Sequence, residues 1–202
     1  MREHVRSGLV TLPEDPPVWE RVFTVNPLVV VGTKEEDGGY DLAPKHMAIP
    51  MGWENYFGFV CTPRHRTYHN ARREGVFTVS YPRPTQVVLA SLAAAPRESD
   101  GSKLAAHALP TFPATEVDGL FIEDAYLFLE CALDRIADDF GENSLIVGRI
   151  LAAHVREDYL RASERDDQDL IHGSPLVAYL SPGRYAPVGE SYSFPFPAGF
   201  MR

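Results

Sequence analysis

Residues 27–47 read PLVVVGTKEEDGGYDLAPKHM, and this segment predicts the first two strands of the fold. Its β-branched run at 28–33 is too short for a helix and predicts a strand. The charged residues 34–37 and the glycine pair 38–39 predict a hairpin turn, because glycine tolerates the positive φ of tight turns. Residues 40–44 then return as the second strand. The stretch therefore predicts an antiparallel β-hairpin.

Four further strands are predicted outward from this hairpin, at residues 56–62, 76–81, 126–136 and 145–155. In the third of them, apolar residues alternate along one face, with Glu130 and Asp134 on the other. The last is apolar on both faces, as in a barrel wall or a subunit interface. Many short strands with few helices between them favour a closed or nearly closed β-barrel over a parallel sheet.

Two short helices and two irregular arms complete the expected organisation. Thr67 is a suitable N-cap for a helix at 68–74, which Gly75 would end. Thr85 is a suitable N-cap for a second helix at 86–94. Proline-rich residues 13–17 and 182–197 predict irregular arms. The length of 202 residues predicts one domain over 1–202, with the barrel at about 22–160 and a C-terminal arm at about 161–202.

Composition excludes several classes of protein. The net charge of −9 argues against a protein that coats nucleic acid or an anionic membrane. No apolar run approaches the ~18 residues of a membrane-spanning helix, and residues 1–17 lack the apolar core of a secretory signal. The two cysteines, Cys61 and Cys131, form no disulfide framework. We therefore expect a cytoplasmic protein with two buried free thiols.

The common catalytic motifs are missing from the sequence. It contains no GxGxxG dinucleotide fingerprint, phosphate-binding P-loop, GxSxG nucleophile elbow or HExxH metal motif. His65 and His69 have the spacing of two metal ligands on one helix face, but no third ligand lies nearby. We therefore predict no metal site.

A basic segment, RHRTYHNARR at residues 64–73, stands out from the acidic chain. It begins where a strand ends and continues into the start of a helix, where unpaired N–H groups attract anions. Arg64, Arg66 and the hydroxyl of Thr67 could together hold a phosphate there. The alternative is a solvated basic face that balances neighbouring carboxylates.

A second cluster, Ala43-Pro44-Lys45-His46-Met47, follows the hairpin. Lys45 and His46 can donate hydrogen bonds to anionic or carbonyl groups, and Met47 can lie against a flat ring. The alternative is a surface loop that the methionine anchors in the core.

In order and spacing, four segments make the chain resemble the flavin reductase-like family of FMN-binding split-barrel proteins. They are residues 27–47, NYFGFVCTPRHRTYHNARREGVFTVSYP at 55–82, LECALDRI at 129–136 and NSLIVGRILAAHV at 143–155, within a likeness over about 22–185. The resemblance implies a mainly β fold, a six-stranded antiparallel split barrel, and a homodimer with one FMN per subunit. It also implies flavin contacts from Ala43, Pro44, Lys45, His46 and Met47, and phosphate contacts from Thr62, Arg64, Arg66 and Thr67.

The sequence departs from the family pattern at residues 45–47, where many members carry small polar residues. A cation such as Lys45 near the pyrimidine end of the flavin would stabilise its anionic reduced form and raise its redox potential. Lys103, in a variable loop, is a possible further neighbour of the cofactor; the alternative is a surface position.

Three functions remain open at this point. The first is an FMN-dependent oxidoreductase that takes a hydride from NAD(P)H, with His46 touching flavin or substrate. The second is a non-catalytic FMN carrier or sensor that receives electrons from a partner protein. In it, Tyr185, Tyr192, Phe194 and Phe196 would cover the flavin of the same or the neighbouring subunit. The third is a dimeric interaction module without a cofactor.

Overall fold

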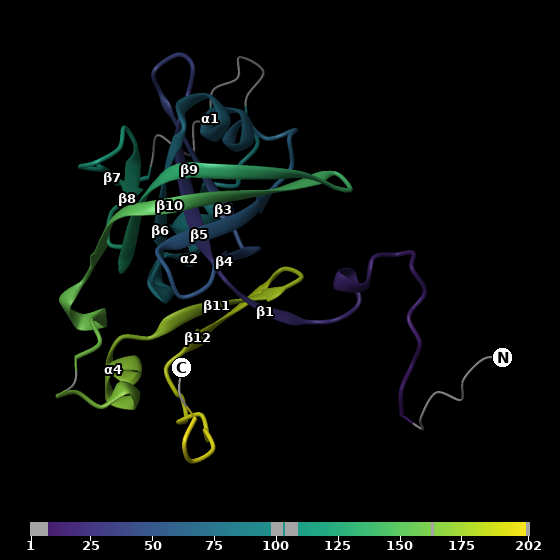
Figure 1. Cartoon of the computed structure of the whole chain (residues 1–202), viewed down its shortest axis with the longest axis vertical. Coiled ribbons are helices and arrows are strands. Elements are labelled where there is room, and N and C mark those ends of the chain that lie inside the picture. The colour runs from purple at the N-terminus through teal and green to yellow at the C-terminus, as the bar shows by residue number, and fades with distance from the viewer. Residues whose placement is uncertain (1–7, 98–102, 104–108, 163, 201–202) are drawn as a thin grey trace.

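The computed structural model describes residues 8–97, 103, 109–162 and 164–200 (Figure 1). Its principal element is a seven-stranded sheet in which all neighbouring strands are antiparallel. In spatial order the strands are β3 (Tyr40–Lys45), β2 (Val29–Lys34), β6 (Val76–Tyr81), β9 (Leu127–Phe140), β10 (Asn143–Val155), β5 (Tyr56–Cys61) and β4 (Ala48–Pro50).

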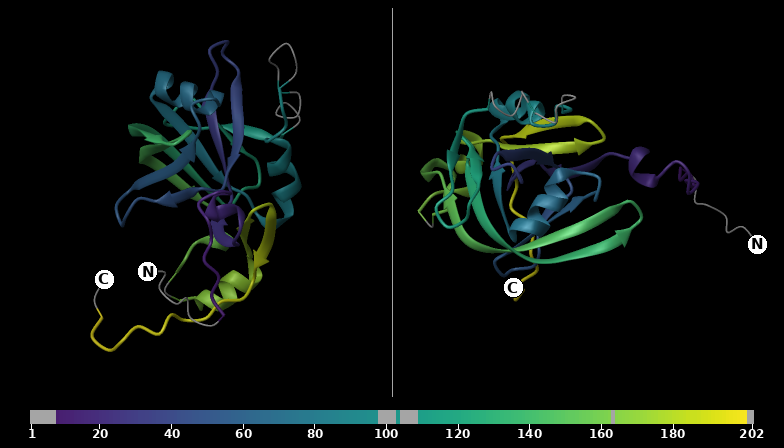
Figure 2. Two further views of the ribbon diagram at one scale, coloured as in Figure 1. Left: turned by 90° about the vertical axis from the view of Figure 1, so that its right-hand side faces the viewer. Right: turned by 90° about the horizontal axis from the view of Figure 1, so that it is seen from above.

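The main sheet curls into a half-barrel, which confirms the predicted mainly β, split-barrel fold (Figure 2). The strand count differs from the predicted six, because the three-residue β4 pairs with β5 as an additional edge strand. Such a short strand carries no pattern by which sequence could identify it.

The predicted hairpin is formed by β2 and β3, with Val29 opposite Lys45 and Lys34 opposite Tyr40. Gly38 adopts a φ of +90° in the turn, as its predicted role requires. This register places the Ala43–Lys45 end of β3 beside the start of β2, at the edge of the main sheet.

The main core lies against the concave sheet and α1. It contains buried residues from six strands and the helix: Val29, Val31, Ala48, Phe57, Phe59, Cys61, Tyr68, Ala71, Phe77, Val79, Leu129, Cys131 and Ile146. Both cysteines are free and buried, as predicted. Packing is tight at Gly148, where an added Cβ would lie 2.5 Å from a ring carbon of Phe77.

Glu130, predicted on the polar face of its strand, is fully buried. Its carboxylate accepts hydrogen bonds from the backbone amides of Thr115, Glu116 and Val117 and from the Thr115 hydroxyl, and lies 3.1 Å from the Nε2 atom of His154. Burial opposes ionisation, but these hydrogen bonds outweigh it and lower the pKa of Glu130 to about 2. An ionised carboxylate therefore ties the 115–117 loop to the sheet.

Two smaller sheets flank the main one. One consists of β1 (Thr24–Pro27), β11 (Leu176–Ser181) and β12 (Arg184–Val188), and the other of β7 (Thr111–Pro113) and β8 (Leu120–Ile122). The β11–β12 hairpin corrects the expectation of an irregular segment over 182–197, because its second strand lies within that range. Figure 1 places this hairpin beside the main sheet, near β4.

The helices are short. They are η1 (Val18–Glu20), α1 (Arg66–Glu74), η2 (Pro84–Gln86), α2 (Val87–Leu92), η3 (Glu157–Tyr159) and α4 (Asp167–Gly173). Gly75 ends α1 in the left-handed conformation, as predicted. The predicted caps are wrong: α1 begins after His65, with Thr67 in its first turn, and Thr85 lies inside η2, ahead of α2.

Candidate functional site

Two adjoining cavities lie where β3 ends. The first, which we call the basic cavity, has a volume of about 450 Å³. Its lining is Asp41, residues 43–45, residues 64–67, residues 93–97 and Lys103. The second, the apolar cavity, has a volume of about 590 Å³. Its lining is Leu28, residues 44–46, Val87, Val88, Ala90, Ser91, Ala94, Tyr179 and residues 183–185. Pro44, Lys45 and Ala94 line both cavities and join them.

The turn between β5 and α1 forms one wall of the basic cavity. Pro63 follows the end of β5, and the chain turns into α1 with His65 as the N-cap residue. No side chain caps this helix, so the opening amides at Arg66 and Thr67 have no partner within the helix. Their N–H groups and the positive end of the helix dipole favour an anion in the cavity.

Two buried carboxylates hold cations around the basic cavity. Glu35 pairs with Arg66 at 3.2 Å and with Arg97. Asp41 pairs with Arg97 at 2.9 Å and with Lys103 at 3.3 Å. Five cationic side chains, at positions 45, 64, 66, 97 and 103, line the cavity, and they outnumber these two carboxylates. The cavity therefore keeps an excess of positive charge that a phosphate can neutralise.

The predicted phosphate ligands are placed differently from one another. Arg66 and Thr67 line the basic cavity. The buried Thr67 hydroxyl donates a hydrogen bond of 3.0 Å to Asp41, so its proton is not free to be donated to a phosphate. Arg64 lines it too, although its guanidinium forms an exposed ion pair with Glu142. Thr62 lines a separate surface cavity around the tip of the β9–β10 hairpin.

Of the predicted flavin contacts, Pro44, Lys45 and His46 line the apolar cavity, and Ala43 lines the basic one. Met47 is 44% exposed and lines neither cavity. Lys45 is nearly buried, and its Nζ atom lies 3.5 Å from the sulfur of Cys61. Burial raises the pKa of the Cys61 thiol, although Lys45 opposes this effect, so the thiol stays protonated at neutral pH.

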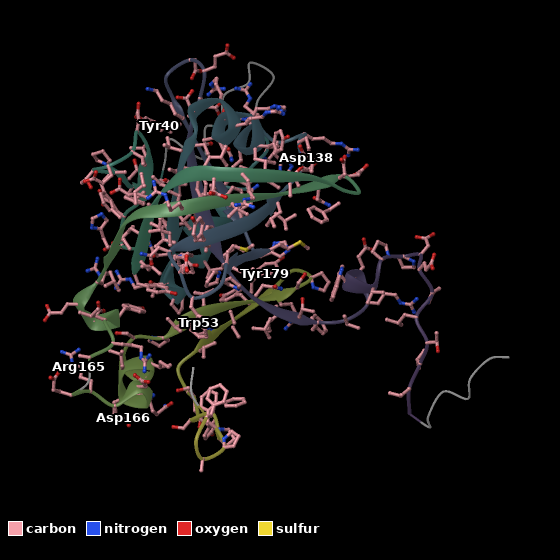
Figure 3. All side chains as sticks on the ribbon, viewed as in Figure 1. Tyr40, Trp53, Asp138, Arg165, Asp166 and Tyr179 are labelled. Atoms are coloured by element: carbon pink, nitrogen blue, oxygen red, sulfur yellow. The ribbon has the colours of Figure 1, made fainter. Side chains whose placement is uncertain are left out.

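His46 contacts the β11–β12 hairpin. Its ring stacks on that of Tyr179, with ring centroids 4.5 Å apart and planes 28° from parallel. Burial, and secondarily the charge of Lys45, lower the pKa of His46, so the imidazole is neutral at pH 7. Figure 3 shows Tyr179 on the hairpin, beside the edge of the main sheet.

Sequence reasoning missed Arg97 and Tyr179 as site residues and left Lys103 undecided. Arg97 lies outside the basic segment at 64–73, and Tyr179 is a single tyrosine within an apolar strand, so no local pattern identifies either as a site residue. Their contacts with Asp41 and His46 join positions more than fifty residues apart.

The described residues contain no group of three or more histidine, cysteine or acidic side chains that could hold a metal ion. Within the same residues, no helix is long and apolar enough to cross a membrane.

Several solved structures share this fold. The 2-nitrobenzoate 2-nitroreductase NbaA of Pseudomonas fluorescens is 20% identical, with a TM-score of 0.76 over 100% of this chain and 99% of that one. A flavin reductase with a split barrel domain from Shewanella frigidimarina is 17% identical, with a TM-score of 0.73 over 86% and 87%. An FMN-binding protein from Thermus thermophilus, solved with bound p-hydroxybenzaldehyde, is 21% identical, with a TM-score of 0.71 over 95% and 100%.

Comparison with curated protein sequences gives no match. A family model does match, over residues 22–185, which is most of the chain and includes both cavities' lining. This model describes the flavin reductase like domain. The predicted resemblance is therefore confirmed, and the chain belongs to the flavin reductase-like family.

Proposed function

We propose that the protein is an FMN-binding oxidoreductase whose cofactor spans the two adjoining cavities. The observation that carries this proposal is the junction at Pro44, Lys45 and Ala94, which connects a cavity rich in cations to an apolar one. FMN has the same polarity along its length, with a dianionic phosphate at one end and a flat ring system at the other. The structural neighbour from Thermus thermophilus is named as an FMN-binding protein, which supports this cofactor.

The residues present fit such a molecule. Arg64, Arg66 and the opening amides of α1 would hold the phosphate, because charged donors and a helix N-terminus both favour a dianion. Lys103 would add a further charge, with its Nζ atom anchored on Asp41 and on the carbonyl of Leu42. The apolar cavity would take the ring system between α2 and the β11–β12 hairpin.

A bound flavin supplies the redox chemistry, since its N5 atom accepts a hydride. The protein then needs only to bind, orient and exclude water. Lys45 carries a buried positive charge at the junction of the cavities. The neutral imidazole of His46 has one N–H to donate to a flavin or substrate carbonyl, and its stacking on Tyr179 fixes the plane of the ring. NAD(P)H is the proposed hydride donor.

The carrier or sensor alternative requires aromatic residues of the C-terminal segment to cover the flavin. Tyr185 lines the apolar cavity, but Tyr192 and Phe194 are 86% and 71% exposed and line neither cavity. This placement leaves the site accessible to a second molecule and favours the oxidoreductase within one chain.

We also propose a homodimer. Large apolar side chains are exposed along both terminal segments, among them Trp19, Phe23, Val25, Phe194 and Phe200. Figure 1 shows the N-terminal segment extending away from the sheet. Apolar surface of this extent favours association, because a second copy would remove it from water.

The cofactor assignment is tested by titrating the protein with FMN and with riboflavin, which lacks the phosphate. We expect FMN to bind more tightly, and the double substitution Arg64→Ala and Arg66→Ala to weaken FMN binding about tenfold, since both arginines are partly exposed. Riboflavin affinity should change little. Arg161→Ala, which removes an exposed, ion-paired arginine that lines neither cavity, is the control. Equal affinities for FMN and riboflavin in the unmodified protein would refute the phosphate site.

Hydride transfer is tested separately. Mixing the FMN-loaded protein with NADH or NADPH under nitrogen in a stopped-flow instrument should bleach the flavin absorbance. Failure of both reductants to bleach bound FMN, together with bleaching by a reduced partner protein, would support the carrier instead.

A further inference from the structure

A buried amine and a buried thiol are in contact at the ends of β3 and β5. The Nζ atom of Lys45 lies 3.5 Å from the Sγ atom of Cys61. The two residues meet because β4 pairs with β5, and the backbone N–H of Val60 donates to the carbonyl of Met47 at 2.8 Å. Lys45 is 9% exposed and Cys61 2% exposed. The proposed flavin chemistry uses the charge of Lys45 and gives the thiol no role.

The environment of Lys45 is unusual for a buried lysine. Lysine side chains at this depth are normally paired with a carboxylate, as Lys103 is with Asp41. Among the residues that the structure describes, Lys45 forms no ion pair, and the sulfur of Cys61 is its one hydrogen-bond partner. The amine is therefore directed at the thiol, and no stronger partner holds it away.

The two cysteines of the chain differ in this respect. Burial raises the pKa of both thiols, that of Cys131 to about 12. At Cys61, the charge of Lys45 and its hydrogen bond to the sulfur oppose this effect. Peroxides oxidise the thiolate form of cysteine, so the small thiolate fraction of Cys61 makes it the more readily oxidised of the two.

We propose that Lys45 and Cys61 form a modification site, at which hydrogen peroxide links Nζ to Sγ through a covalent S–N bond. Peroxide first oxidises the thiol by two electrons: its O–O bond breaks, one oxygen bonds to Sγ as a sulfenic acid, and the other leaves as water. The neutral amine then attacks Sγ. The S–N bond forms as the S–O bond breaks, and the hydroxyl leaves with one amine proton as a second water. The protein loses two hydrogens and gains no oxygen.

The cross-link has a consequence for the cofactor site. Lys45 is one of five cationic side chains that line the basic cavity, and it lines the apolar cavity as well. A nitrogen bonded to sulfur holds no proton at neutral pH, so the link removes this positive charge. The cross-linked protein should bind FMN about threefold more weakly. The link itself needs no flavin, and only this consequence rests on the proposed function.

The cross-link is tested by peptide mapping of the flavin-free full chain. The protein is treated with hydrogen peroxide, unfolded, alkylated with iodoacetamide and digested with trypsin, which cleaves after Lys45 in the untreated protein. We expect this cleavage to stop, so that residues 35–64 remain one peptide, lighter by two hydrogens and not alkylated at Cys61. Dithiothreitol should restore both the cleavage and the alkylation. Fragment ions assign any oxygen that peroxide adds to Met47 or Met51.

Three variants assign the link to this pair. Cys61→Ser should abolish it and keep the cleavage after Lys45. Lys45→Met removes the amine that captures the sulfenic acid, so peroxide should carry Cys61 on to sulfinic acid, which dithiothreitol does not reduce. Cys131→Ser, which removes the other buried free thiol, is the matched control and should leave the link unchanged.

Three results would overturn the proposal: Cys61 that stays alkylatable after peroxide, oxidised Cys61 with normal cleavage after Lys45, or a linked peptide that keeps an oxygen between sulfur and nitrogen. Titration of the cross-linked and the untreated protein with FMN then tests the consequence, and equal affinities would refute it. Failure of the untreated protein to bind FMN would refute the proposed function, whereas the peptide map decides the cross-link in either case.

Discussion

Replacing Glu130 by glutamine should destabilise the protein far more than a change of one charge at the surface. The glutamate is fully buried, and its carboxylate accepts hydrogen bonds from three consecutive backbone amides and one hydroxyl of the 115–117 loop. The glutamine oxygen can accept only part of this set, and the new NH₂ group would face N–H donors. Some buried N–H donors would then lack partners. Each hydrogen bond to a charged group contributes roughly 1.5–3 kcal/mol to stability, and its loss costs a similar amount.

The pKa of the carboxyl gives an independent magnitude. It is lowered from 4.5 to about 2, so the ionised group stabilises the folded state by about 3 kcal/mol at neutral pH. Because the folded-state pKa is the lower one, this stabilisation is present above pH 4.5 and is lost as the pH falls toward 2. It should decrease by about 2 kcal/mol between pH 6 and pH 3.

Urea unfolding followed by circular dichroism, at pH 7, 5, 4 and 3, measures both the stability lost on substitution and its dependence on pH. We expect Glu130→Gln to lower the free energy of unfolding by about 3 kcal/mol at pH 7, and the melting temperature by roughly 6–12 °C. The difference from the unmodified protein should shrink at acidic pH, since glutamine does not titrate. Glu157→Gln, at an exposed position, is the control and should change stability by less than about 0.5 kcal/mol. A loss below about 1 kcal/mol at pH 7, or one independent of pH, would refute the reasoning.

Three other predictions concern the core, the cofactor and the assembly. Gly148→Ala should destabilise the protein by about 1–3 kcal/mol in urea unfolding, because its Cβ would meet the ring of Phe77 at 2.5 Å; an unchanged midpoint would contradict this. Lys45→Met should lower the midpoint potential of bound FMN by about 30 mV in a spectroelectrochemical titration, since it removes a buried cation from the junction of the cavities; an equal or higher potential would count against that role. Light scattering should give twice the chain mass, and a monomer at micromolar concentration would rule out the proposed dimer.

Much of the fold could be predicted because its cues are local. The β-branched run before the Gly38-Gly39 turn predicted β2 and β3, whose bounds differ from the prediction by one residue at most. The long strands β9 and β10 followed from apolar periodicity. The three-residue strands were missed because they are too short for periodicity, and β12 because it lies in proline-rich sequence. The six-residue β11, which precedes that sequence, was also not predicted.

The candidate site could be predicted only in outline. Arg66 and Thr67 do line a cavity, as the basic segment predicted, but the hydroxyl of Thr67 is used by Asp41. That carboxylate is twenty-six positions away in the chain, on a neighbouring strand. A sequence pattern indicates which hydrogen-bonding groups a side chain carries, but not which partner in the folded protein forms the hydrogen bond.

Local periodicity and turn chemistry act between residues close in the chain, so they predicted the strands, the hairpin and the position of the basic turn. The resemblance of the ordered segments to the flavin reductase-like family supplied the split barrel. Three features depend on the folded chain and could not be predicted from local sequence: the burial of Glu130 under a loop, the ion pairs of Glu35 and Asp41, and the contact of Tyr179 with His46. These contacts join residues from 13 to more than 130 positions apart. Which side chains are buried, and which partners their hydrogen bonds take, is therefore fixed only in the folded chain.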